Sequence, residues 1–361
     1  MKLLKKLTAL LLICLMALSL TACHKKGEIA VTINDCEFTS AYYMCAFINA
    51  YLQGQQEVAL NLSEEEAQQE IDYTKQKIDD KKFEEWVKDT AIDALKKNAY
   101  YKTLCQEKKI ELSDEYKTAN DYYVSMYWTS YGYSELFAPN GVSLETFTQY
   151  MLDEYYAPVY FEYIYGEKGE KEIPAKDVEE KLYKDFIIAD ILEYNHSKDT
   201  GKDLKKTIKE FEAYAEDIKN GKKTFEEVYN KFNDIKETEK EDHKDHDHAE
   251  PKDALAQVIG AEGTGTSYEH DYFKDINKMA NGEIKVITKK DDAGCLLVIK
   301  KDIKDDEYYL ENMDMQIRHL LKDDEFNKKG DEESKKLTAD INKYAVNQFK
   351  VKKIKEPKYA Y

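Results

Sequence analysis

Residues 186–192 read Phe-Ile-Ile-Ala-Asp-Ile-Leu, and residues 294–300 read Gly-Cys-Leu-Leu-Val-Ile-Lys. Both runs are short, apolar and bounded by polar segments, which predicts buried β-strands over 186–192 and 296–299. Charged, amphipathic patterns between them predict helices over 204–220 and around 225–232. We therefore expect a small domain in which helices accompany a sheet.

The rest of the chain is predicted to be mainly helical, so that the fold class is α+β. Glycine (14) and proline (5) are scarce, whereas soluble proteins contain roughly 7% and 5% of them. We expect a strand at 28–33, helices from 41 towards 52, over 83–107, 307–322 and 334–348, and an exposed edge strand at 349–354. Thr39 or Ser40, Ser113 and Ser143 are expected to be helix N-caps.

The first residues have the pattern of an export signal. Three lysines precede an apolar run from Ala9 to Leu20, which ends in Leu20-Thr21-Ala22-Cys23. A run of about 12 residues is too short to span a bilayer but suits a signal peptide. The ending resembles the lipobox of bacterial lipoproteins, which implies cleavage before Cys23 and a diacylglyceryl group on its thiol. We expect a lipid anchor on the extracytoplasmic face of a bacterial membrane; an ordinary secretory signal is the alternative.

The charge and the motifs exclude several functional classes. The net charge is −18, and losing the three lysines of residues 1–22 makes it −18 − 3 = −21. So acidic a surface disfavours nucleic acid. Nucleotide-binding loops, hydrolase elbows and zinc-protease motifs are absent from the sequence. We expect free, mostly buried thiols at Cys36, Cys45, Cys105 and Cys295, with a structural disulfide as the open alternative.

Three segments resemble the PrsA/SurA-type family of extracytoplasmic foldases, which contain a parvulin prolyl-isomerase domain. The opening Ile29-Ala-Val-Thr-Ile-Asn-Asp resembles the start of its chaperone domain, Gly282-Glu283-Ile284 with 294–300 resembles the closing parvulin strands, and the last helix and lysine-rich tail resemble the returning segment. The implied domains are a signal peptide (1–22), a tether (23–27), a helical chaperone domain (28–172), a parvulin-like domain (173–303) with an acidic, His-rich loop (236–253), and a C-terminal return (304–361).

The resemblance implies two isomerase histidines, but Asp190 and Leu296 occupy those positions. We therefore expect isomerase activity to be weak or lost in a chaperone that binds exported, unfolded polypeptides. An active isomerase using Asp234, Phe273 and Met279 is the alternative. Self-association into a homodimer stays open.

Two tyrosine-rich stretches are candidate peptide-binding surfaces. Tyrosine offers apolar area with a polar tip, so it suits varied polypeptides. The candidate contact residues are Tyr123, Tyr127, Trp128, Tyr155, Tyr272 and Phe273. A tyrosine-rich helical core is the alternative for each of them.

One further segment has metal-ligating residues. His243, His246 and His248 alternate with carboxylates, a combination that suits Zn²⁺. Their spacing fixes no geometry, so we expect at most adventitious zinc and no cofactor. A metal-capturing lipoprotein is the second alternative.

Overall fold

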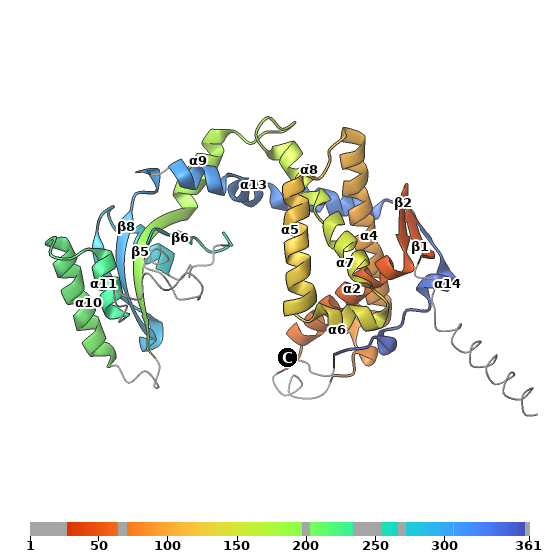
Figure 1. Cartoon of the computed structure of the whole chain (residues 1–361), viewed down its shortest axis with the longest axis horizontal. Helices are drawn as coiled ribbons and strands as arrows, with labels where there is room; N and C mark the ends of the chain where they lie inside the picture. The colour runs from red at the N-terminus through yellow and green to blue at the C-terminus, as the bar shows by residue number, and fades with distance from the viewer. Residues whose placement is uncertain are drawn as a thin grey trace, which may run out of the picture. The chain divides into compact units, whose positions relative to one another are not determined.

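The computed structural model describes residues 27–63, 71–196, 203–233, 255–265, 272–305 and 307–357. These residues form two compact units (Figure 1). Unit 1 comprises the described residues up to Glu172 and from Asp323 onward, and unit 2 runs from Ile173 to Lys322. In the described ranges no helix combines the length and apolarity needed to cross a bilayer. The mainly helical α+β fold predicted from the sequence is confirmed.

Unit 1 is a set of helices beside a small antiparallel sheet of order β2-β1-β9. Its first elements are β1 (Ile29–Ile33), β2 (Cys36–Thr39), α2 (Ser40–Leu60), β3 (Lys77–Ile78), β4 (Lys81–Lys82), α4 (Phe83–Lys108), α5 (Asp114–Ser125), a π-helix (Met126–Ser130), α6 (Tyr133–Phe137), α7 (Leu144–Asp153) and α8 (Tyr156–Tyr165). The side chains of Thr39, Ser113 and Ser143 cap α2, α5 and α7 as predicted.

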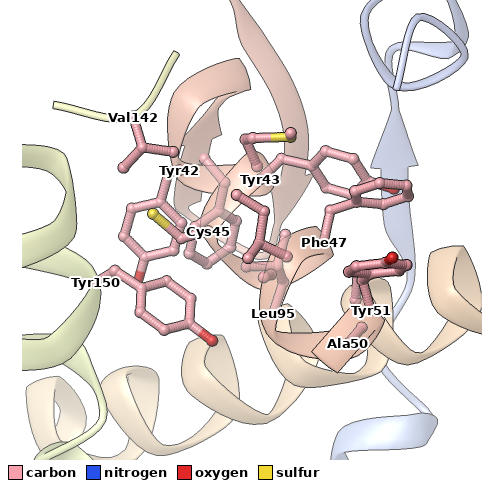
Figure 2. Close-up of a cluster of buried hydrophobic side chains, with 14 of the residues drawn as sticks. Tyr42, Tyr43, Cys45, Phe47, Ala50, Tyr51, Leu95, Val142 and Tyr150 are labelled. Carbon is pink, nitrogen blue, oxygen red and sulfur yellow. The ribbon is translucent and has the colours of Figure 1, made fainter. Parts of the chain in front are cut away.

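Helix α2 is the centre of the unit 1 core (Figure 2). Tyr43, Cys45 and Phe47 on this helix are fully buried, and Leu95 of α4 packs against the same cluster. Tyr42 lies 5.3 Å from Tyr150 of α7, ring centroid to ring centroid. Several tyrosines therefore occupy core positions that leucine or phenylalanine occupies in other proteins.

The end of unit 1 differs from the prediction. Helix α13 (Glu307–Lys335) is followed by β9 (Ala339–Ile341), α14 (Lys343–Val346) and a 3₁₀ turn (Val351–Lys353). The predicted helix over 334–348 and edge strand over 349–354 are both wrong. Pairing with the free edge of β1 makes 339–341 a strand. Phe349 does not alternate outward, because it packs on Tyr43 and Phe47.

Unit 2 is built on a four-stranded antiparallel sheet of order β6-β5-β8-β7. Its elements are α9 (Ala175–Asp185), β5 (Phe186–Asn195), α10 (Leu204–Lys219), α11 (Phe225–Phe232), β6 (Gln257–Gly260), α12 (Phe273–Asn277), β7 (Ile284–Thr288) and β8 (Gly294–Lys301). Residues of α10 and α11 pack on one sheet face, and residues of α12 pack on the other. The strands and helices predicted around 186–232 and 296–299 are confirmed.

Unit 2 includes the described residues of α13 up to Lys322, and the rest of this helix belongs to unit 1. Arg318 lies in the first half of α13 and is buried. It pairs with Asp314 and donates from Nη1 to the Ile173 carbonyl at 2.8 Å. The bond to Ile173 joins this part of α13 to the first residue of unit 2.

Candidate functional site

A run of aromatic rings follows α5, the π-helix and α6 in unit 1. Tyr122, Tyr123 and Tyr131 are 66%, 43% and 58% exposed, although large apolar rings are usually buried. The ring centroids of Tyr123 and Tyr127 are 6.5 Å apart. The centroid of Tyr127 is also 5.6 Å from that of Tyr131 and 5.3 Å from that of Tyr133. The chain of rings ends at Phe137 in the core, 5.6 Å from Tyr133.

A π-helix lies within this run of rings. Tyr131 donates its backbone N–H to the Met126 carbonyl at 3.1 Å, which is the wider i→i+5 bond. Short π segments inside α-helices occur frequently at functional sites because they move side chains out of the ordinary helical register. Here the segment lies between exposed Tyr123 and exposed Tyr131.

Tyr155, which lies between α7 and α8, belongs to the same group of rings. Burial raises the pKa of its hydroxyl, and the neighbouring Tyr123, Glu154 and Tyr127 raise it further. The ring of Tyr116 stands edge-on to Tyr155 at 5.4 Å. Three residues singled out from the sequence, Tyr123, Tyr127 and Tyr155, therefore lie together. We call Tyr122, Tyr123, Tyr127, Tyr131 and Tyr155 the aromatic surface.

Trp128 lies at the inner side of this surface. Its ring packs on buried Phe147 of α7 with centroids 5.4 Å apart, and it is only partly exposed. Trp128 therefore contacts both the aromatic run and the core, and its role in peptide binding stays a prediction.

A second feature of unit 1 is an open pocket of about 680 Å³ between β2, α4 and α7, which we call the edge pocket. It is lined by Asp35, Cys36, Glu37, Phe38, Thr39, Tyr42, Lys102, Gln106, Glu145, Thr146, Thr148, Gln149 and Asp153. The sequence did not indicate this pocket, because its walls come from three separate segments.

At the floor of the edge pocket lies a buried ion pair. Asp153, 3% exposed, accepts hydrogen bonds from Lys102 Nζ at 3.0 Å, Gln149 Nε2 at 2.8 Å and the Tyr42 hydroxyl at 2.9 Å. Burial and then the Asp153 charge raise the pKa of Tyr42. Burial also raises the pKa of the Cys36 thiol, and this outweighs the lowering by Lys102. A raised thiol pKa lowers the share of reactive thiolate at Cys36.

In unit 2, Asp190 and Leu296, the two residues that the sequence resemblance compares with the isomerase histidines, lie on opposite faces of the sheet. Asp190 pairs with Ile299 in the register between β5 and β8, whereas Leu296 pairs with Glu193. Successive strand residues face opposite ways, so 190 and 193 cannot share a face. Asp190 accepts from the Ala256 backbone N–H at 2.8 Å and pairs with Lys301 at 2.7 Å, and Leu296 is buried in the α12-side core.

The candidate isomerase side chains Phe273 and Met279 share the face of Leu296. They are 9% and 4% exposed and belong to the same core cluster as Tyr272. Lys289 Nζ lies 5.9 Å from the centroid of the Tyr272 ring and also binds Glu193 and Asn195. Tyr272 and Phe273, predicted as peptide contacts, therefore have little exposed area.

Several predicted residues fall outside the described part of the chain. These are the lipidated Cys23, the isomerase candidate Asp234, and the metal-ligand candidates His243, His246 and His248. The described cysteines Cys36, Cys45, Cys105 and Cys295 are free thiols, and all but Cys36 are buried.

Solved structures similar to this chain include those of PrsA from three bacteria. The structure from Lactococcus lactis is 11% identical, with 88% of this chain and 96% of that chain covered and a TM-score of 0.42. The one from Streptococcus pneumoniae is 12% identical, covers 89% and 98%, and has a TM-score of 0.41. The one from Bacillus subtilis is 15% identical, covers 69% and 84%, and has a TM-score of 0.33. No protein-family model and no curated protein matches the chain.

Proposed function

We propose that this protein is an extracytoplasmic chaperone of the foldase type, lipid-anchored through Cys23, that binds exported unfolded polypeptides on the aromatic surface of unit 1. The sequence resemblance gives the class of function, and the exposure of Tyr122, Tyr123 and Tyr131 is the observation that supports the site. Exposed rings in contact with one another offer apolar area to clients of any sequence.

We further propose that prolyl-isomerase activity is weak or absent. Twisting an X–Pro amide has a barrier of about 18–20 kcal/mol, and an isomerase must lower it with polar groups placed around the amide. On the α12 side of the sheet, Leu296 stands beside Phe273 and Met279 and offers no hydrogen-bonding group. The carboxylate of Asp190, on the other face, already pairs with Lys301 and accepts a hydrogen bond from a backbone N–H.

The test is suppression of aggregation of a reduced, unfolded model protein, followed by light scattering, with isomerisation of an Ala-Pro peptide measured in parallel. Replacing Tyr122, Tyr123 and Tyr131 together by serine is expected to reduce suppression severalfold, because each substitution removes an exposed ring without opening the core. The matched control is Tyr344→Ser, since Tyr344 is 75% exposed on α14, away from these rings in the sequence.

Suppression by the wild-type chain and by Tyr344→Ser, together with loss in the triple variant, would support the proposal. Equal suppression by all three would place the client site elsewhere. Acceleration of Ala-Pro isomerisation that Phe273→Ala abolishes would show that unit 2 is an active isomerase.

A further inference from the structure

Strand β2 leaves one edge of the unit 1 sheet without a partner strand in the described part of the chain. Ile33 and Cys36 face each other next to the turn at Asn34–Asp35, so this pair exchanges the ladder hydrogen bonds. The next pair is Thr32 and Glu37, and in an antiparallel ladder the bonding alternates. The N–H and C=O of Glu37 therefore point away from β1, towards the free edge.

This edge opens into the edge pocket. The residues from Asp35 to Thr39 line it without interruption, although their side chains alternate between the two sheet faces. We take this continuous lining, which includes residues of both faces, as the sign that the free edge of β2 borders the pocket. The opposite walls are Lys102 and Gln106 of α4 and residues of α7 such as Gln149.

The rim of the pocket is acidic. Asp35, Glu37 and Glu145 are exposed carboxylates, whereas the ammonium group of Lys102 is bound to Asp153. An occupant with positively charged side chains complements this rim, and an extended backbone complements the strand edge.

We propose that the edge pocket binds an extended, lysine-rich segment of a client polypeptide, which adds to β2 as an extra antiparallel or parallel strand. This inference rests on the proposed chaperone function and deepens it, because it gives one part of the client a defined binding mode. Backbone hydrogen bonds to a strand edge are independent of side-chain identity, so the site accepts many sequences provided that they are extended and basic. The aromatic surface then holds apolar parts of the same client.

The test uses the full chain in mild detergent and a fluorescent peptide of alternating lysine and valine, with binding followed by anisotropy. Two derivatives carry the same number of backbone N-methyl groups. When the methyl groups are on alternate residues, one strand edge of the peptide stays free, so binding is expected to be close to that of the parent. When they are on consecutive residues, both edges are blocked, and affinity is expected to fall about tenfold or more.

Two substitutions test the same edge from the protein side. Glu37→Pro removes the outward N–H, and because that N–H is not used in the ladder with β1 the hairpin is expected to persist. Affinity should fall about tenfold, compared with about threefold for Glu37→Ala, which removes only a rim charge. The methylated peptides are tested on the unsubstituted protein. They therefore test strand addition even if Glu37→Pro fails to fold.

Equal affinity for both methylated peptides would overturn strand addition, as would loss of peptide binding in the Tyr122, Tyr123 and Tyr131 triple variant. Absence of peptide binding by a chain that still suppresses aggregation would reject the inference and leave the proposed function standing. Absence of both activities would reject both.

Discussion

Asp153 shows how a single buried charge fixes the geometry of unit 1. Its carboxylate is held by Lys102, Gln149 and Tyr42, which come from α4, α7 and α2. Burying a charge costs several kcal/mol unless partners compensate for the lost water. The pair therefore ties three helices together below the edge pocket.

At the residue scale, Lys102→Met is expected to destabilise unit 1 by about 3 kcal/mol, because it leaves the Asp153 carboxylate buried without its counter-charge. Lys117→Met is the control, since the Lys117–Asp114 pair has the same 3.0 Å separation but is exposed on both sides, and such pairs contribute roughly 0–1 kcal/mol. Urea unfolding followed by tryptophan fluorescence measures the difference, because Trp86 and Trp128 both belong to unit 1. Equal losses in the two variants would mean that the buried pair has no special role.

At the element scale, the second half of α13 packs on α4 at a close contact. The rings of Tyr101 and Phe326 stack with centroids 5.1 Å apart. Gly330 lies next to Tyr101, and a Cβ added to it would be 2.9 Å from Tyr101 Cζ and closer still to the hydroxyl. Within the described ranges of the chain, the buried Tyr101 hydroxyl has no hydrogen-bond partner.

Gly330→Ala is therefore expected to destabilise unit 1 by about 1–3 kcal/mol through overpacking, although alanine in an open helix position gains about 1 kcal/mol over glycine. Adding Tyr101→Phe should recover part of this loss, since it removes the nearest atom. Thermal unfolding of the two single variants and the double variant measures the coupling. A stabilising Gly330→Ala would show that α13 and α4 do not approach so closely.

The elements also show which parts of the fold the sequence could predict. Helices α10 and α11 were found because each has its own amphipathic period and cap. Strand β9 was missed because 339–341 becomes a strand only by pairing with β1, some 300 residues earlier in the chain. Likewise, alternation predicts that Asp190 and Ile191 face opposite ways, but only the pairing of Asp190 with Ile299 shows that Leu296 lies on the other face.

For the two surfaces of unit 1, the sequence carried a signal for the aromatic residues and none for the edge pocket. Tyr123, Tyr127 and Tyr155 were candidates because they lie in tyrosine-rich stretches of the sequence. The edge pocket had no such signal, because Cys36, Lys102 and Asp153 meet only through tertiary packing. The short π-helix before exposed Tyr131 has no reliable sequence signature either.

At the scale of the whole molecule, the net charge of −18 should select among clients. Acidic groups attract basic, unfolded chains over about 10 Å at 0.1 M ionic strength, and added salt removes this attraction. Contacts with the aromatic surface depend on apolar area and are not screened. Suppression of aggregation of a basic client is therefore expected to weaken severalfold between about 0.05 and 0.5 M NaCl, whereas suppression of an acidic client should change little or improve. Light scattering of the two clients at matched concentrations measures both trends, and an identical salt response would show that charge has no part in client choice.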